Sequence, residues 1–373
     1  MNGVVFAGGG TGGHLYPALA LADAIKALRP QTDVYFVGAQ RGVEARVLPA
    51  ENKPHTLLPF EPLRRSQVWQ NWKLLPSLVK SFIGLGRVFT QKRPRLVVGT
   101  GGYASAPACL LAVASGIPIA IQEQNSYPGL TTRLLSRWAR QVHLGFPEAA
   151  KLLKPGKHTT VSTLGNPIRP PDKNLVRPDC RAIFGLKPES TVLLVVGGSQ
   201  GSRAINETLT RALIRNKGLP AGMEILWATG PNNHASVTGA LAGGLAPSES
   251  IGIHALPYIS NMPEALCAAD VAISRAGAMG TAELLAWGIP SVLIPLPTAA
   301  ADHQTHNARA LADAGAAKLL IERELTPEVL WDTVIELVQD DAERETMAAA
   351  ARDRARPHAA SQIASRLLEL IES

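Results

Sequence analysis

The sequence predicts an α/β protein with two domains, each built on a doubly wound parallel sheet. Three observations support this prediction. The chain has 373 residues, more than one hydrophobic core usually supports. Short apolar strands alternate with helix-period stretches along the chain, as in βαβ units. Each half opens with a strand that runs into a glycine-rich loop, so the two halves repeat one architecture.

The predicted strands are short apolar runs, and the first βαβ unit shows the pattern most clearly. A strand at 4–7 leads through a glycine loop into a helix-period run at 17–28, and a second strand follows at 34–37. Further strands are expected at 96–98, 117–121, 192–196, 225–227, 271–273 and 292–294. Helices are expected at 326–338, 343–355 and 361–371.

A turn-rich segment at 165–171 predicts the domain boundary. Three of its last five residues are proline, which continues neither a helix nor a central strand. We therefore expect a first domain at 1–165 and a second domain at 166–356. A break at Arg356–Pro357 would let the last helix, 357–373, pack back on the first domain.

Charge is divided unevenly between the two halves. Residues 1–165 hold 19 Lys and Arg against 7 Asp and Glu, whereas residues 166–373 hold 18 against 23. The first half alone is therefore expected to face an anionic partner, either nucleic acid or an anionic membrane surface. Hydrophobic residues make up 46% and charged residues 18% of the chain, which argues against long disorder.

Cysteine usage and the N-terminus indicate a cytoplasmic protein. Cys109, Cys180 and Cys267 are too far apart for a C-x-x-C site and form no readable disulfide framework. The first residues lead straight into an apolar strand, without the basic and apolar regions of a signal peptide. The longest apolar stretch, 106–121, is interrupted by glycine and proline, so no membrane-spanning helix is expected.

The first glycine loop, residues 8–14, lies between a strand and a helix, where backbone N–H groups favour an anion. It matches the G-x-G-x-x-G pattern of dinucleotide sites. Such sites also need an acidic residue at the carboxyl end of the second strand, but Asp33 precedes that strand and Gly38–Ala39 end it. The loop is therefore not expected to bind NAD. A turn that only allows close packing would explain one or two of its glycines.

Two more polar segments follow predicted strands of the first half, namely Gly101–Ser105 and Glu123–Asn125. Ligands of open α/β sheets bind at the carboxyl ends of the strands, so both segments are candidate site elements. Glu123 is the only carboxylate between Glu61 and Glu148. It is either a solvated loop charge or part of a site, and both alternatives remain open.

Two segments of the second half also run from a strand into a helix. Gly197–Arg203 offers amide N–H groups, hydroxyls and a guanidinium to a diphosphate. Ser274–Glu283 ends in a carboxylate near the start of its helix. Glu283 would either accept hydrogen bonds from ribose hydroxyls or be an ordinary acid favoured by the helix dipole.

The segment Asp302–Asn307 combines an aspartate with two histidines, as some metal sites do. Gln304 and Asn307, however, stand at i and i+3 on one helix face. Their amide groups suit sugar hydroxyls better than a metal shell. No metal site and no cofactor are therefore assigned.

Seven of these motifs together resemble one family, the bacterial undecaprenyldiphospho-muramoylpentapeptide β-N-acetylglucosaminyltransferases, or MurG family, of glycosyltransferase family 28. The likeness covers nearly the whole chain in the family's order. The motifs are 8–14, 101–103, 123–125, 165–169, 197–201, 275–283 and 302–304. One departure is Gln122, because the family often has histidine before Glu-Gln-Asn. This departure leaves His14 as the better candidate for a base.

The resemblance implies a GT-B fold, in which two Rossmann-like domains enclose a cleft. The second domain would hold the donor, UDP-N-acetylglucosamine, and the first the acceptor, lipid I. Ser199 would contact the diphosphate, Glu283 the ribose and Gln304 the sugar hydroxyls, while the backbone of Ile259 would contact the uracil. Donor-binding residues carried over by motif are Thr11, Gly12, Gly13, Asn125, Arg169, Ser199, Gln200, Ile259, Ala278, Met279, Gly280, Thr281, Ala282, Glu283 and Gln304. Acceptor-binding residues are Gly101, Gly102 and Tyr103.

The implied reaction is a single inverting displacement that yields lipid II for peptidoglycan synthesis. The acceptor C4 hydroxyl attacks the anomeric carbon of the donor through an oxocarbenium-like transition state. His14 is the first candidate for the base that takes the hydroxyl proton, because histidine titrates near neutrality, and Glu123 is the second. The helix N-terminus at Ser199–Arg203 would stabilise the leaving diphosphate without a metal.

A basic, acid-free segment between Pro62 and Gln122 fits an acceptor that lies in a membrane. Its cations are Arg64, Arg65, Lys73, Lys80, Arg87, Lys92, Arg93 and Arg95, and its interleaved apolar residues are Trp69, Trp72, Leu75, Val79, Phe82 and Ile83. Leu75, Val79 and Phe82 share one helix face, so the helix packs this face on the sheet, lies on anionic lipid, or does both. We expect a peripheral protein on the cytoplasmic face of the cell membrane.

Other classes explain fewer of these features. A UDP-N-acetylglucosamine 2-epimerase would use the same donor but would need neither a lipid acceptor nor a basic apolar surface, and product analysis separates the two. A dehydrogenase lacks the ribose-binding acid described above. A nucleic-acid-binding scaffold would explain the basic half, but helix-turn-helix, zinc and RNA-binding signatures are absent, and no nucleic acid is expected as a partner.

Overall fold

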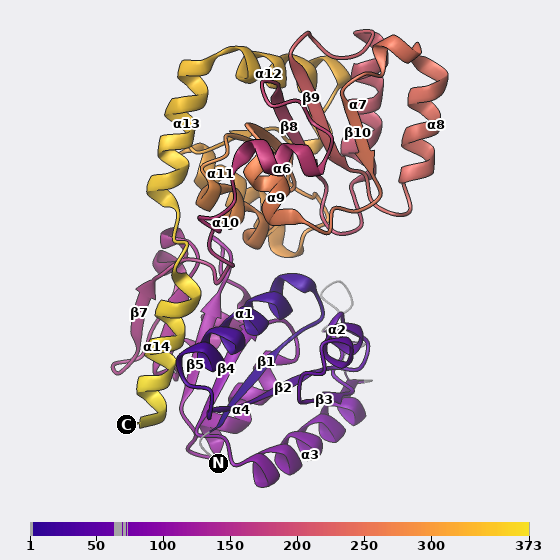
Figure 1. Ribbon diagram of the computed structural model, residues 1–373. Coiled ribbons are helices and arrows are strands. Elements are labelled where there is room, and N and C mark those ends of the chain that lie inside the picture. The colour runs from indigo at the N-terminus through magenta and orange to yellow at the C-terminus, as the bar shows by residue number, and fades with distance from the viewer. Residues whose placement is uncertain (1–2, 63–68, 70–71, 73, 373) are drawn as a thin grey trace. The chain divides into compact units, whose positions relative to one another are not determined.

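The computed structural model describes residues 3–62, 69, 72 and 74–372 (Figure 1). The chain divides into two compact units. The first unit comprises Met1–Arg169 and Arg356–Ser373, and the second comprises Pro170–Ala355. The division lies after Arg169, whereas the sequence placed it after residue 165. The last helix belongs to the first unit.

Within the described residues, the first unit contains a seven-stranded sheet in the order β3-β2-β1-β4-β5-β6-β7, and every neighbouring pair is parallel. The strands are β1 (Gly3–Gly8), β2 (Asp33–Ala39), β3 (His55–Leu58), β4 (Leu96–Gly101), β5 (Ile119–Glu123), β6 (Gln141–Leu144) and β7 (Thr160–Thr163). The strand order reverses between β1 and β4. Ligands bind at such switch points, outside the carboxyl ends of the strands.

Helices cover both faces of this sheet. They are α1 (Gly12–Leu28), α2 (Glu44–Ala50), α3 (Leu75–Lys92), α4 (Ser105–Ala114), α5 (Leu130–Leu135), the 3-10 helix η2 (Pro147–Leu152) and α14 (Ala359–Glu372). On one face, α1 and α14 lie side by side over the stacked rings of Phe6 and Phe36 (Figure 1). On the other face, α3, α4 and α5 pack over a core that includes Val5 and Val97.

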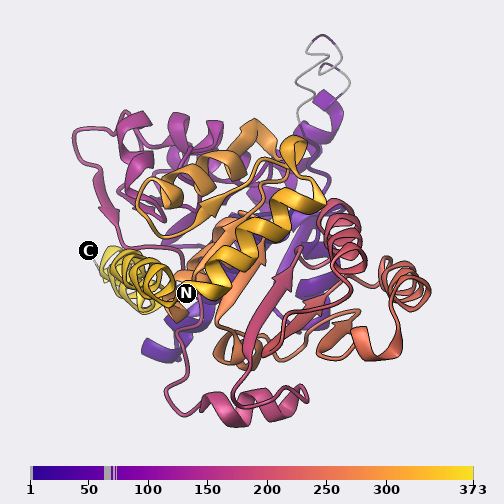
Figure 2. The ribbon, with the colours of Figure 1, turned by 90° about the horizontal axis from the view of Figure 1, so that it is seen from above.

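The second unit repeats this architecture. In its described residues, six parallel strands follow the order β10-β9-β8-β11-β12-β13. The strands are β8 (Thr191–Val196), β9 (Met223–Ala228), β10 (Ile253–Leu256), β11 (Val271–Ser274), β12 (Ser291–Leu293) and β13 (Lys318–Leu319). The α-helices are α6 (Arg177–Ile183), α7 (Arg203–Arg215), α8 (His234–Gly244), α9 (Met262–Ala268), α10 (Ala278–Trp287), α11 (His303–Ala312), α12 (Pro327–Gln339) and α13 (Asp341–Arg354). The golden helix α12 runs across this sheet in Figure 2 and buries Leu330 and Val334 in its core.

The amphipathic helix α3 bears on the two alternatives that the sequence left open for the face with Leu75, Val79 and Phe82. Leu75 and Val79 are exposed, by 59% and 51%, and do not pack on the sheet with Phe82, which is partly buried. The helix instead buries Leu85, Val88 and Phe89, because these residues follow the stripe that faces β3 and α4. Arg64, Arg65 and Lys73 lie outside the described residues.

None of the helices in the described part of the chain has the length and apolar character needed to cross a bilayer.

The contact between α14 and α1 predicts a stability effect. Ile363, Leu367 and Ile371 are buried at helical spacing against α1 and the sheet. Leu367→Ala removes apolar contacts and leaves a cavity, so we expect urea unfolding to show a loss of about 2–5 kcal/mol. Glu369→Ala, on the exposed face of the same helix, is the control and should change the free energy by less than about 0.5 kcal/mol. An equal effect of the two changes would contradict this packing.

Candidate active site

The first glycine loop is closed by an internal carboxylate. Glu44 begins α2 and is completely buried. The N–H group of Gly10 donates to both carboxylate oxygens, at 3.0 Å to Oε1 and 2.9 Å to Oε2, and the N–H group of Ala39 donates to Oε1 at 2.8 Å. A Cβ atom on Gly38 or Gly42 would come within 2.5 Å of Glu44, so both positions require glycine.

This arrangement bears on the expectation that the backbone N–H groups of the first loop favour an anion. The Gly10 N–H group already donates to a negatively charged group of the protein. A phosphate at the same position would meet a carboxylate of like charge. The loop is therefore unsuited to hold a diphosphate at Gly10, which adds to the case against a dinucleotide site.

His14 lies in the first turn of α1, where three contacts hold it. Its Nδ1 atom is 3.1 Å from the Thr11 hydroxyl, and the Thr100 hydroxyl donates to its backbone carbonyl at 2.8 Å. The ring lies against the backbone of Gly101, where a Cβ would come 2.6 Å from the ring Cδ2 atom. The side chain is half-buried, so the ring is fixed but remains accessible.

The end of β4 meets the glycine loop at the switch point of the sheet. Gly102 has φ +77°, and a Cβ there would lie 2.0 Å from the carbonyl oxygen of Gly9. The Tyr103 ring packs where a Cβ of Gly10 would stand. Burial raises the pKa of Tyr103, and the nearby charge of Glu44 raises it further. The structure thus brings Gly101, Gly102 and Tyr103 together with His14, in one group of residues.

Glu123 is the last residue of β5, whereas the sequence predicted that this strand ends at residue 121, and its carboxylate is buried. Oε2 accepts from the Thr132 hydroxyl at 2.6 Å and from the Gly129 N–H group at 3.0 Å. Oε1 accepts from the backbone N–H group of Asn125 at 3.1 Å and from its side chain at 3.3 Å. The carboxylate therefore holds the turn between β5 and α5 and orients Asn125, which is half-buried.

Gln122, which stands at the position before this glutamate, takes part in a second buried hydrogen-bond network. The Gln122 amide donates to Asn166 Oδ1 at 3.1 Å, and Gln124 donates to the Thr100 carbonyl at 2.9 Å and to Gln122. Asn166 donates in turn to the Gln124 carbonyl at 3.0 Å. Gln122 therefore links the end of β5 to the segment that precedes the exposed Arg169.

The second glycine loop opens into a cavity of about 770 Å³ in the second unit. The loop joins β8 to α7, and Ser202 caps that helix by accepting from the N–H group of Ile205 at 3.4 Å. Gly201 has φ +73°, and a Cβ there would come 2.0 Å from the Thr229 carbonyl. Its N–H group closes the turn on the Gly198 carbonyl at 2.9 Å. The cavity thus lies at a helix N-terminus, which favours an anion.

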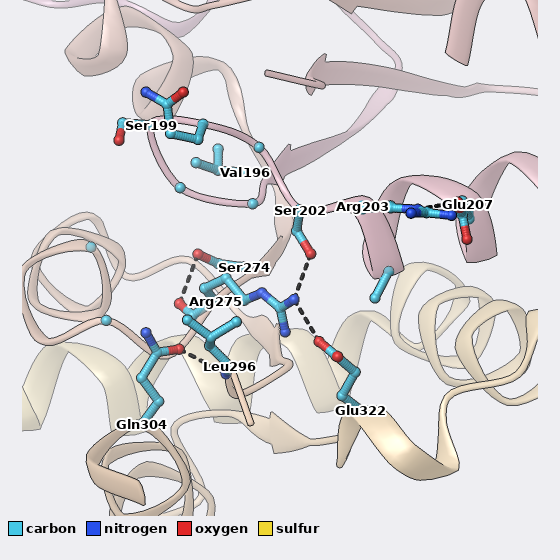
Figure 3. Close-up of a pocket in the computed structure, with 17 residues that line it drawn as sticks. Val196, Ser199, Ser202, Arg203, Glu207, Ser274, Arg275, Leu296, Gln304 and Glu322 are labelled. Carbon is cyan, nitrogen blue, oxygen red and sulfur yellow. Dashed lines mark hydrogen bonds and ion pairs between the residues drawn. The ribbon is translucent and has the colours of Figure 1, made fainter. Parts of the chain in front are cut away.

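Arg275 forms one wall of this cavity, between Ser202 and Glu322 (Figure 3). Its Nη2 atom donates to Ser202 Oγ at 2.6 Å and lies 2.5 Å from Glu322 Oε2. Its Nη1 atom donates to the carbonyls of Ile294 and Pro295, at 3.1 Å each. The guanidinium is therefore fixed in place before any ligand binds.

The cavity brings together parts of three predicted motifs, with Ser199 and Gln200 exposed on the loop. Gly280 lines the cavity from α10. The described lining does not include the other predicted residues, which are Ala278, Met279, Thr281, Ala282 and Glu283 of that helix and the buried Ile259. Thr281 donates its hydroxyl to carbonyls of its own helix turn, at Gly277 and Ala278.

Gln304 lines the cavity from α11, and its Oε1 atom accepts from the Leu296 N–H group at 2.9 Å. Asn307, expected to present its amide beside Gln304, is buried instead and donates to the Ala276 carbonyl at 3.2 Å. This expectation was wrong because the helix turns Asn307 toward the end of β11. Within the described residues, no three His, Cys, Asp or Glu side chains gather as a metal site requires.

Three charged lining residues were given no individual role from the sequence. Arg275 lay inside a motif. Glu322 follows the short edge strand β13, and only its place after the carboxyl end of a strand could have indicated a site residue. Glu207 lies one helical turn after Arg203, and Arg203 Nε donates to its carboxylate at 2.7 Å. This hydrogen bond lowers the pKa of Glu207 and raises that of Arg203.

Removing the Glu44 carboxylate should destabilise the first unit. In Glu44→Ala the N–H groups of Gly10 and Ala39 lose their acceptor and a cavity forms, so urea unfolding should show a loss of about 2–4 kcal/mol. Glu51→Ala, at the exposed end of the same helix, is the matched control with an expected change below about 0.5 kcal/mol. A small effect of Glu44→Ala would mean that the loop does not depend on this carboxylate.

Comparisons with known proteins agree over the whole chain. Residues 4–144 match the glycosyltransferase family 28 N-terminal domain, and residues 192–363 match the C-terminal domain of that family. A protein from Moorella thermoacetica is 42% identical over 374 residues, with 99% of each chain covered. It is named UDP-N-acetylglucosamine--N-acetylmuramyl-(pentapeptide) pyrophosphoryl-undecaprenol N-acetylglucosamine transferase. A protein of the same name from Chlorobaculum parvum is 40% identical and covers 99% of this chain and 100% of its own.

A solved structure supports the same assignment. The crystal structure of Acinetobacter baumannii MurG is 31% identical, has a TM-score of 0.76, and covers 98% of this chain and 99% of its own. The prediction of a GT-B fold with two parallel-sheet domains is confirmed. The chain therefore belongs to glycosyltransferase family 28.

Proposed function

We propose that this chain transfers N-acetylglucosamine from UDP-N-acetylglucosamine to the C4 hydroxyl of the muramyl pentapeptide of lipid I, giving lipid II. The observation that carries the proposal is the cavity at the N-terminus of α7, with the Arg275 guanidinium in its wall. The full-length relatives, at about 40% identity, are named for this reaction. The transfer inverts the anomeric carbon.

The second unit would hold the donor. A volume of about 770 Å³ suits a ligand of nucleotide size. The helix N-terminus, the loop around Ser199 and Gln200, and Arg275 would bind the diphosphate, which becomes more negative as the sugar leaves. Gln304 would bind sugar hydroxyls and Glu283 the ribose. Backbone contacts to the uracil would come from Ile259.

The first unit would supply the base and bind the acceptor. We assign the base to His14, because its ring is accessible and oriented by Thr11. Glu123 is less suited, since both its oxygens accept hydrogen bonds from the turn that it holds. Further donor contacts are proposed for Thr11, Gly12, Gly13, Asn125, Arg169 and residues 278–282, and acceptor contacts for Gly101, Gly102 and Tyr103.

Exposed apolar residues of the first unit suit a lipid surface, where lipid I resides. We define the apolar patch as Trp69, Trp72, Leu75, Leu78, Val79 and Ile83, all exposed. Lys80 and Arg87 are exposed on the same helix, α3. An apolar stripe with cations beside it binds anionic membranes. We propose peripheral binding at the cytoplasmic face of the cell membrane through this patch.

Replacing His14 should slow the chemical step and leave donor binding intact. We expect His14→Ala to lower kcat about 10²- to 10⁴-fold, because the acceptor hydroxyl loses its base. The assay measures transfer of labelled sugar from UDP-N-acetylglucosamine to a short-chain lipid I analogue. His158→Ala, at an exposed histidine of the same unit, is the control and should keep the parent rate.

The same assay tests the reaction itself. If the parent enzyme releases UDP or epimerises the donor without transferring sugar, the donor site would stand but the assignment of lipid I as acceptor would be refuted. Full activity of His14→Ala would refute the assignment of the base.

Acidic residues in the apolar patch should weaken membrane binding. Val79 and Ile83 are about half exposed, so the double change to Glu should not disturb the core. We expect binding to vesicles rich in phosphatidylglycerol to fall about tenfold or more, since two charges must approach a negative surface. Ile251→Glu, at an exposed apolar residue of the second unit, is the control. Unchanged binding of the double variant would refute this surface.

A further inference from the structure

The wall of the donor cavity contains a carboxylate, which is unexpected for a pocket that binds a diphosphate. Glu322 lines the cavity together with the loop before α7 (Figure 3). It begins the short 3-10 helix η5 (Glu322–Glu324), directly after the edge of the sheet. Its side chain is 23% exposed, whereas its Oε2 atom is buried against Arg275.

The contacts of Glu322 are directed at a single cation. Its Oε2 atom lies 2.5 Å from Nη2 of Arg275, whose side chain is only 11% exposed. The same Nη2 atom donates to Ser202 Oγ at 2.6 Å, and Ser202 caps α7. Arg275 therefore connects Glu322 to the helix end that would hold the diphosphate.

Arg275 does not need Glu322 to keep its position. Two backbone carbonyls, those of Ile294 and Pro295, accept from Nη1 at 3.1 Å each, and Ser202 accepts from Nη2. A glutamine at position 322 would still offer an oxygen to the guanidinium. The carboxylate thus contributes mainly a negative charge, which offsets the positive charge of Arg275 beside the ligand.

A negative charge at this place affects donor and product unequally. UDP has a terminal phosphate with a second ionisation near pH 6, whereas the sugar ester of the donor removes that ionisation. UDP is therefore the more negative ligand at neutral pH. A fixed carboxylate near the diphosphate repels UDP more strongly than UDP-N-acetylglucosamine.

We propose that Glu322 limits the affinity of this cavity for UDP by neutralising Arg275, so that the spent nucleotide leaves while the donor still binds. The proposal rests on the proposed function, because it takes UDP as the product. Glu322 acts here on the strength of diphosphate binding and takes no part in bond making.

The test compares three proteins, the parent, Glu322→Gln and Glu324→Gln, by calorimetric titration of the full chain with UDP, UDP-N-acetylglucosamine and uridine. Glu324 is the matched control, because it is exposed, lies in the same short helix and pairs only with its neighbour Arg323 among the described ion pairs. We expect Glu322→Gln to bind UDP about three- to tenfold more tightly, which corresponds to a binding free energy more favourable by about 0.7–1.4 kcal/mol. The affinity for UDP-N-acetylglucosamine should increase less than the affinity for UDP. The affinity for uridine, which lacks phosphate, should not change.

Two further measurements distinguish an effect of the Glu322 charge from a structural effect of the substitution. The gain for UDP should shrink at high salt, because screening weakens the repulsion that was removed. Product inhibition of sugar transfer by UDP should tighten by the same factor as the binding constant. Glu324→Gln should match the parent in every titration.

Unchanged or weaker UDP binding in Glu322→Gln, with a parent that binds UDP, would overturn this inference alone. Equal shifts for UDP and uridine would also overturn it, since they would indicate a structural role. A parent that does not bind UDP would overturn the proposed function together with this inference.

Discussion

A helix N-terminus carries partial positive charge and is stabilised by a nearby negative group. The two sites of this protein differ in which group supplies that negative charge. Each unit has a glycine loop between its first strand and the following helix. In the first unit the chain supplies its own anion, because Glu44 accepts from Gly10. In the second unit the loop borders a cavity, and Arg275 adds positive charge beside it. One architecture thus yields one closed loop and one loop open to an anionic ligand.

This difference gives the two units separate tasks. The closed loop is a rigid support, on which Thr11, Gly101 and the Thr100 hydroxyl position His14. The open loop would stabilise a diphosphate that gains negative charge as the glycosidic bond to the sugar breaks. The carboxylate of Glu322 moderates the second site, because a cavity that is too positive would retain its product. In this account, charges fixed at the carboxyl ends of the second sheet would stabilise the leaving diphosphate and promote its release, and His14 at the first sheet would act as the base.

Much of this was predictable from the sequence, and the failures have physical causes. Central strands such as β1, β4 and β8 are continuous apolar runs, so their positions were expected correctly. The strands that were missed, β3, β6, β7, β10 and β13, lie at or next to sheet edges and are short and more polar. The loops were found because glycine marks tight approaches. Glu44 and Glu322 were missed because each acts on a partner distant in sequence, Gly10 or Arg275, and only the fold creates those pairs.

The central claim is that the second glycine loop, and not the first, binds the diphosphate. Amide hydrogen exchange of the full chain, measured with and without UDP, tests it most directly, because backbone N–H groups that bind phosphate become protected. The account predicts protection of residues 197–203 and 274–280 and little change at residues 8–10, which Glu44 closes. Protection at residues 8–10 without protection at residues 197–203 would contradict it.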